Sequence, residues 1–232
     1  MILQSLSKKK LLRFIHVGKC GGSTIKKLLA DSPLVACNYE SVIQSHIHGV
    51  SLDTTCDYLI CLRNPISRAI SAFEWRKKLV ISDPVPNQQN RFRGESNVLK
   101  AYSSFSDLTS KLYQEDDSLN ELVARDFQLI HHLRESISFY LRPLLPVLTC
   151  SNVYGIICQE TLSVDCEKLL GIAPKEIVER KNNLRQESPV TLGNQAVANL
   201  KRYLHDDYVC ITSLWSKSIL SDRQFSSLML GE

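Results

Sequence analysis

A lysine, two glycines and two hydroxyl residues follow an apolar run near the start of the chain. The stretch reads Phe14-Ile15-His16-Val17-Gly18-Lys19-Cys20-Gly21-Gly22-Ser23-Thr24-Ile25. Glycines let backbone N–H groups approach an anion closely, and the first turn of a following helix adds its positive dipole end. The residue types and their spacing therefore predict a phosphate-binding loop between a strand and a helix.

This loop differs from the two commonest nucleotide-binding loops. In a Walker A loop the lysine follows the last glycine, whereas Lys19 precedes Gly21 and Gly22, and no Gly-Lys-Ser/Thr occurs in the chain. The dinucleotide fingerprint G-x-G-x-x-G is also missing. Taken alone, a Gly-Gly turn with a helix cap at Ser23 explains the stretch equally well.

A second strand–helix junction lies at residues 57–73. Asn64 can cap a helix there, and Pro65 suits the first helical position. Apolar residues then recur with helical spacing, at Ile66, Ala69, Ile70 and Phe73, while Ser67 and Ser71 fall on another face. Arg63 is placed where the strand ends, and its planar guanidinium can hold a phosphate through paired hydrogen bonds. If both junctions bind one ligand, that ligand carries phosphates at both ends of a nucleoside.

The two motifs resemble those of sulfotransferases that use 3′-phosphoadenosine 5′-phosphosulfate, in particular the carbohydrate-type and bacterial branch. The family's 5′-phosphosulfate loop commonly reads His-Val-Pro-Lys-Thr-Gly-Gly-Thr-Ser, and Gly18 and Cys20 replace the proline and the first threonine. Its 3′-phosphate motif reads Arg-Asp-Pro, two residues, Arg, and a later Ser, and Asn64 replaces the aspartate. The resemblance spans most of the chain, but only these two motifs are specific.

The resemblance implies a donor, a reaction and a set of site residues. The donor would be 3′-phosphoadenosine 5′-phosphosulfate and the product adenosine 3′,5′-bisphosphate, with no metal. A sulfuryl group would move in line to a hydroxyl or amine of a carbohydrate-like or small-metabolite acceptor. Lys19 would stand beside the bridging oxygen, and Arg63 and Ser71 would bind the 3′-phosphate. The residues expected to bind the 5′-phosphate are Lys19, Cys20, Gly21, Gly22, Ser23 and Thr24.

A histidine is the expected base for the acceptor, since its pKa near neutrality lets it accept and release a proton. Related carbohydrate sulfotransferases have a Gly-His pair about seventeen residues before the 3′-phosphate arginine. His46 lies 17 residues before Arg63, with Ser45 in place of the glycine. His48 competes with it, because alternate residues of an extended strand share a face. Trp75 either packs in the core or borders the adenine.

Strands alternate with helices along the chain, which predicts a single α/β domain over residues 1–232 with a central parallel sheet. The resemblance implies that this domain has the P-loop-like sulfotransferase fold. We expect residues 1–10 to be a flexible N-terminus and residues 81–97 to form a long loop. The expected strands are 12–17, 34–37, 58–62 and 153–158. The expected helices are 23–31, 65–79, 97–114, 118–135, 159–170 and a final one at 192–204.

The composition of the chain limits the kinds of partner that we expect it to bind. The chain has 28 Lys and Arg against 24 Asp and Glu, a net charge of +4 that fits an anionic ligand, and no basic stripe with interleaved aromatics indicates nucleic acid. Eight cysteines form no C-x-x-C pair, so we expect reduced, mostly buried thiols. Without a signal peptide or an apolar run of about 18 residues, we expect a cytoplasmic enzyme with no membrane span. The acceptor and the oligomeric state stay open, as does an N-terminal extension.

Two other functions compete with the transferase interpretation. A relative that binds nucleotide without turnover, serving as an interaction module, is favoured by the changes at Gly18, Cys20, Ser45 and Asn64. A nucleotide or small-molecule kinase with an atypical loop would need magnesium and ATP. The missing Gly-Lys-Ser/Thr counts against the kinase.

Overall fold

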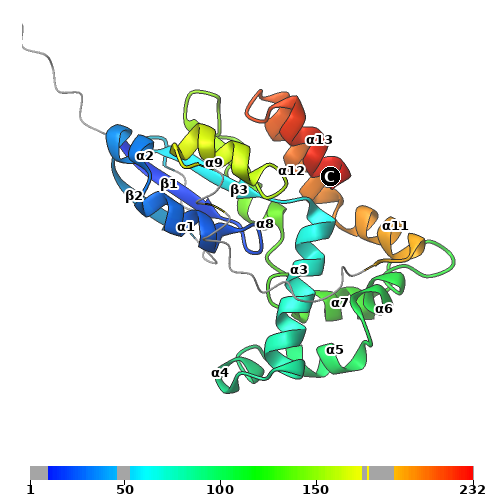
Figure 1. Ribbon diagram of the computed structural model, residues 1–232. Helices are drawn as coiled ribbons and strands as arrows, with labels where there is room; N and C mark the ends of the chain where they lie inside the picture. The colour runs from blue at the N-terminus through cyan, green and yellow to red at the C-terminus, as the bar shows by residue number, and fades with distance from the viewer. Residues whose placement is uncertain (1–9, 46–52, 174–176, 178–190, 232) are drawn as a thin grey trace, which may run out of the picture.

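Four parallel strands form one sheet at the centre of the fold (Figure 1). The computed structural model describes residues 10–45, 53–173, 177 and 191–231. The sheet order is β2-β1-β3-β4, and every neighbouring pair is parallel. The strands are β1 (Lys10–His16), β2 (Tyr39–Ser45), β3 (Asp57–Leu62) and β4 (Val153–Cys158). The predicted α/β fold with a central parallel sheet is confirmed.

Burial along the strands follows their place in the sheet. β3 reads Asp-Tyr-Leu-Ile-Cys-Leu, and every residue after Asp57 is buried, as expected for an inner parallel strand covered on both faces. β2 lies at one edge, and most of its residues are exposed. The inner strands β1 and β3 therefore carry the most buried part of the sheet, and their ends are held firmly.

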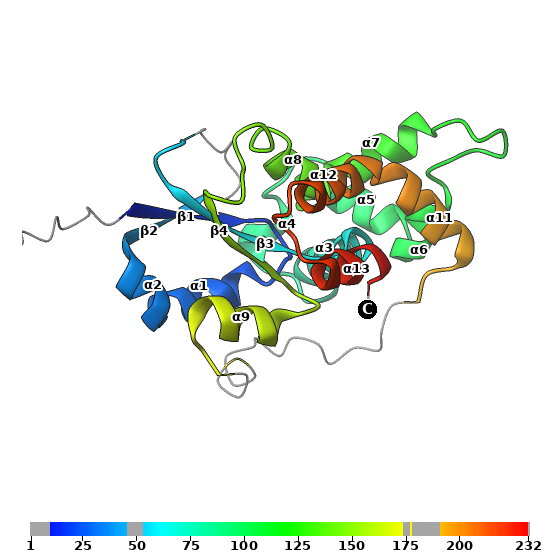
Figure 2. The same ribbon diagram turned by 90° about the horizontal axis from the view of Figure 1, so that it is seen from above.

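Helices cover the sheet and share its core. Figure 2 shows three helices together on one side of the sheet: α1 (Gly22–Ala30), α2 (Pro33–Asn38) and α9 (Leu162–Leu170). Side chains from three more helices join the same hydrophobic core: α8 (Ile137–Leu141), α12 (His205–Ser216) and α13 (Asp222–Leu230). In the described part of the chain, no helix is both long and apolar enough to cross a membrane.

A second hydrophobic core lies beyond the carboxyl ends of the strands, where α3 extends from β3 into a group of helices (Figures 1 and 2). Phe73 of α3 packs there against Phe105, which in turn packs against Phe127. The elements of this part are α3 (Pro65–Lys77), the π-helix η1 (Lys78–Ser82), α4 (Pro86–Gln89), α5 (Glu95–Ala101), α6 (Phe105–Ser110), α7 (Glu121–Leu129) and α11 (Asn194–Tyr203). Because α3 contributes to this core and starts at the sheet, it connects the sheet with the second hydrophobic core.

The strand expected at residues 34–37 is wrong, since those residues lie in α2. Ser32 caps that helix by accepting a hydrogen bond from the Val35 amide, and Pro33 occupies its first turn. The strand comes later, as β2. Its exposed, polar sequence at the sheet edge lacks the apolar run by which the inner strands were recognised.

Several helix boundaries also differ from expectation. The helix expected at 97–114 is two helices, because Ser104 caps α6 by accepting the Asp107 amide. Asn120 caps α7, which ends at Leu129 rather than near 135. The expected loop at 81–97 contains α4 and the start of α5. The helix expected at 192–204 is present as α11 but is not the last, since α12 and α13 follow it.

Candidate functional site

The carboxyl ends of three neighbouring strands meet at one edge of the sheet. The register pairs His16 of β1 with Cys61 of β3, and Leu62 of β3 with Cys158 of β4. The chain leaves β1 for β2 on one side and returns to β3 on the other, so the β1–β3 boundary is the switch point at which such sheets bind ligands. Both predicted phosphate junctions follow strands at this boundary.

The β1–α1 loop, residues 17–21, has a backbone that favours glycine at its end. Gly21 is the N-cap of α1 with φ of 78°, a left-handed conformation that L side chains rarely adopt. A Cβ on Gly22 would overlap the His16 ring, whose Nδ1 lies 2.8 Å from Gln44 Nε2. Lys19 also has a positive φ, 68°, without being glycine. Backbone strain of this kind tends to persist at functional sites.

The first turn of α1 presents unpaired amides. Among the described residues, no hydrogen-bond partner is found for the amides of Gly21, Gly22 and Ser23. No acidic side chain lies in that turn. Free N–H groups at the positive end of a helix attract anions. The loop predicted to bind a phosphate therefore has a backbone suited to it, and the Thr24 amide is already bonded to Gly21 O at 3.0 Å.

Lys19 projects from this loop toward α3. Its Nζ lies 4.5 Å from the centroid of the Trp75 ring. Burial, followed by the positive charges of Arg63 and Arg68, lowers the pKa of Lys19 to about 8. The two sequence motifs are therefore near enough for their cations to interact, and positive charge accumulates between them.

The second junction is built as the sequence predicts. Asn64 caps α3 by accepting the Ser67 amide at 2.9 Å. Arg63 stands directly before this cap, partly buried, and its charge acts on both Lys19 and Glu160. The Asn64 amide donates to Glu160 Oε1 at 2.9 Å, which fixes the start of the helix against the end of β4.

Ser71 lies on the side of α3 that faces the β1–α1 loop. It is three residues after Arg68 and four before Trp75, and residues at these spacings share a helix face. Arg68 contacts Gly18 of the loop, and Trp75 contacts Lys19. Ser71 itself is partly buried. The structure thus brings this predicted residue toward the same region as the loop lysine.

Arg68 lies beneath the loop; it is the second arginine of the 3′-phosphate motif, but the motif gives no sign of this buried, supporting position. Its side chain is 1% exposed, and Nε donates to Gly18 O at 2.9 Å. Nη2 donates to His132 O at 2.7 Å and to Glu135 O. It makes no ion pair with any carboxylate in the described part of the chain. Arg68 therefore ties three backbone segments together and adds an uncompensated charge below the site.

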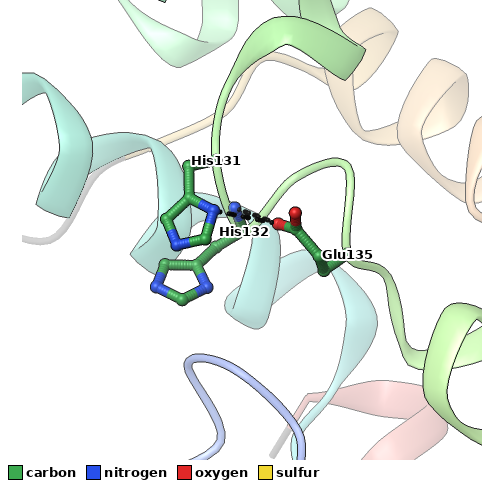
Figure 3. Close-up of side chains that lie close together, drawn as sticks. All are labelled: His131, His132 and Glu135. Carbon is green, nitrogen blue, oxygen red and sulfur yellow. Dashed lines mark hydrogen bonds and ion pairs between the residues drawn. The ribbon is translucent and has the colours of Figure 1, made fainter. Parts of the chain in front are cut away.

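Two histidines and a glutamate form a cluster next to Arg68 (Figure 3). His132 Nδ1 would lie 2.7 Å from a Cβ on Gly18, so the ring packs directly against the loop. Burial, together with the nearby charges, lowers the pKa of His132 to about 2, so the ring is neutral. Burial acts to raise the pKa of Glu135, but hydrogen bonds from His131 and Arg134 prevail and lower it.

This cluster has donors of the kind that bind metals, and their ligand atoms lie within 4.8 Å of one another. However, the rings of His131 and His132 lie one above the other with centroids 4.0 Å apart (Figure 3). Lone pairs in nearly facing ring planes do not converge on one point. Glu135 already accepts hydrogen bonds from Arg134 and from the His132 amide. The arrangement fits a hydrogen-bonded support for the loop better than a metal centre.

Glu160 is a site residue that the motifs do not reveal. It follows β4, and its Oε2 is buried without a hydrogen-bond partner among the described residues. Burial raises the pKa of Glu160, while the Asn64 amide and Arg63 act in the opposite direction. An acidic residue directly after a strand is the signal that points to it, but only the neighbouring position of β3 places it beside Arg63.

Cys20 and the two candidate bases differ in what the structure says of them. The Cys20 side chain is fully buried, and burial raises the pKa of its thiol to about 12, so only its backbone can face a ligand. His46 and His48, the expected bases, lie outside the described residues. That one of these two histidines acts as the base therefore stays a prediction.

A separate cavity lies elsewhere in the fold. A pocket of about 470 Å³ opens between α7, α8 and the α11–α12 junction, and none of its lining residues belongs to the β1–α1 loop. Its charged residues are already paired, Arg142 with Asp206 at 2.6 Å and Arg134 with Glu135 at 2.7 Å. The residues at the strand ends therefore indicate function more strongly than the size of this cavity does.

Comparison of the chain with protein-family models, with curated proteins and with solved structures finds no match.

Proposed function

We propose that this chain is a sulfotransferase that moves a sulfuryl group from 3′-phosphoadenosine 5′-phosphosulfate to a hydroxyl or amine of a carbohydrate-like or small-metabolite acceptor. One observation carries the proposal: the β1–α1 loop and Arg63 follow neighbouring parallel strands at their carboxyl ends. A ligand with a phosphate at each end of a nucleoside matches this pair of junctions. The motifs described from the sequence favour that donor over other bisphosphates.

Each part of the site has a role in this proposal. The free amides of Gly21, Gly22 and Ser23 would hold the 5′-phosphate. Arg63 and Ser71 would hold the 3′-phosphate. Arg68 would support the loop from below without touching the donor.

In the transfer step, the bond between sulfur and the bridging oxygen breaks as sulfur bonds to the acceptor oxygen or nitrogen. The acceptor's proton passes to a base, for which His46 and His48 remain the candidates. The leaving phosphate gains negative charge, and the Lys19 ammonium would stabilise it. With a pKa of about 8, Lys19 is mostly protonated at neutral pH, as this role requires.

Calorimetric titration tests the donor site. We expect adenosine 3′,5′-bisphosphate to bind without metal, and Arg63→Met to weaken that binding. Arg142→Met is the matched control, since it removes an exposed arginine paired with Asp206 far from the loop. Binding of ATP only with magnesium, and none of the bisphosphate, would instead support a kinase.

Transfer of labelled sulfate to a panel of sugars and small hydroxyl compounds then tests catalysis. Sulfated product formed by the native protein and lost in Lys19→Ala would support the transferase. Tight bisphosphate binding with no product from any acceptor would favour the inactive, nucleotide-binding relative.

A further inference from the structure

The Lys19 ammonium makes a cation–π contact with Trp75. The indole belongs to α3 and is partly buried, and Lys19 Nζ lies over its face at 4.5 Å from the centroid. This distance is well within the range in which an aromatic ring attracts a cation. The chain has only two tryptophans, and the other, Trp215, lies on α12, stacked on Phe225.

The surroundings explain why this contact matters. The charged groups that act on Lys19 are Arg63, Arg68 and Arg76, and all three repel the ammonium. His132 also acts on Lys19 but is neutral, and the adjacent Cys20 thiol is buried and protonated. Among the described residues, Lys19 has no ion pair with a carboxylate.

We infer that Trp75 is a positioning residue whose ring face holds the Lys19 ammonium beside the β1–α1 loop before a ligand binds. A lysine side chain loses much rotamer freedom when it is fixed, and the ring fixes it in advance. The cation is then already in place when charge develops on a leaving group. The catalytic meaning of this contact rests on the proposed function, but the contact itself does not.

A fluorescence titration tests the contact without any ligand. In the Trp215→Phe protein, Trp75 is the only indole, so its emission reports the state of Lys19. We expect a step in emission centred near pH 8, where Lys19 loses its proton, and no such step after the further change Lys19→Met. A flat titration, or the same step in both proteins, would overturn the inference.

Kinetics test the positioning role once transfer is measured. We expect Trp75→Leu to lower kcat about fivefold, on the scale of one partly exposed cation–π contact, with KM for the donor nearly unchanged. Trp75→Phe keeps an aromatic face and should restore most of kcat. Unchanged kcat in Trp75→Leu, or failure of Trp75→Phe to restore it, would contradict the inference.

The two proposals fail in different ways. If calorimetry detects no bisphosphate binding, the donor assignment fails, while the pH titration of Trp75 still decides the contact. If the bisphosphate binds but the emission of Trp75 shows no pH step in the Trp215→Phe protein, the positioning role fails and the donor site stands.

Discussion

Replacing Arg68 with methionine should destabilise the protein measurably, because three backbone carbonyls depend on this guanidinium. Methionine has a similar length, so it fills much of the space and leaves little cavity. The carbonyls of Gly18, His132 and Glu135 would each lose a hydrogen bond in a buried setting. At roughly 1 kcal/mol for each unpaired group, the loss is about 3 kcal/mol.

An opposing effect reduces this figure. Arg68 is a buried cation with no described carboxylate partner, and removing such a charge relieves its desolvation cost. We therefore expect the free energy of unfolding to fall by about 2 kcal/mol. With a urea slope of about 2 kcal/mol per molar, the unfolding midpoint should move down by about 1 M at an unchanged slope.

Arg142→Met is the matched control in the same urea experiment. Arg142 pairs with Asp206 at 2.6 Å, but its side chain is 62% exposed, and exposed ion pairs contribute about 0–1 kcal/mol. Its midpoint should stay within about 0.5 M of the native protein. Equal midpoints for Arg68→Met and the native protein would refute the reasoning, since the three hydrogen bonds would then carry no net stability.

Three further predictions concern the ligand and the thiols. Arg63→Ala should weaken the binding of adenosine 3′,5′-bisphosphate by about 1.5–3 kcal/mol in calorimetry and leave the binding of adenosine 5′-phosphosulfate almost unchanged. Equal losses of binding for both compounds would mean that the 3′-phosphate lies elsewhere. The pKa of Lys19 is about 8 in the folded chain against 10.5 for a free lysine. Between these values the unfolded chain binds more protons at Lys19, so the unfolding free energy of the native protein should rise with pH relative to that of Lys19→Met. A difference between the two proteins that stays constant with pH in urea unfolding would contradict this. Cys37 and Cys150 are exposed and should react with a thiol reagent in the folded protein, whereas Cys20 should react only after unfolding; early labelling of Cys20 by mass spectrometry would show an open loop.

The features that could be predicted from the sequence are those fixed by neighbours in the chain. The helix after β3 follows from Asn64 and Pro65, which cap and start it locally. The expected helix at 159–170 ends where predicted, because α9 ends at Leu170 and its C-cap Gly171 has a left-handed φ of 68°. β3 was found because it is a continuous apolar run, and β1 because apolar residues dominate it on both sides of Arg13. Local signals of this kind sufficed to place both predicted phosphate junctions at the ends of strands.

Features that depend on distant segments could not be predicted. Arg68 occupies the second arginine position of the 3′-phosphate motif, but its burial under the segment at His132 and Glu135 depends on contacts distant in sequence. Glu160 becomes a neighbour of Arg63 only through the pairing of β3 with β4. β2 is an edge strand stabilised by its ladder with β1 rather than by burial of its side chains, so its polar sequence gave no strand pattern.

The concentration of positive charge at the strand ends leads to a last prediction about ligand binding. Lys19 is held at a lowered pKa by burial and by Arg63 and Arg68, so part of the protein carries it without a proton at pH 8. A bound phosphate beside Lys19 would favour the charged form and raise its pKa again. Binding of adenosine 3′,5′-bisphosphate at pH 8 should therefore take up protons, a quantity given by calorimetry in buffers of different ionisation enthalpy. The uptake should vanish in Lys19→Met, and it should fall at pH 6.5, where Lys19 is already protonated. Binding without proton uptake at pH 8 would place the phosphate away from Lys19, because no anion can approach that ammonium closely and leave its pKa unchanged.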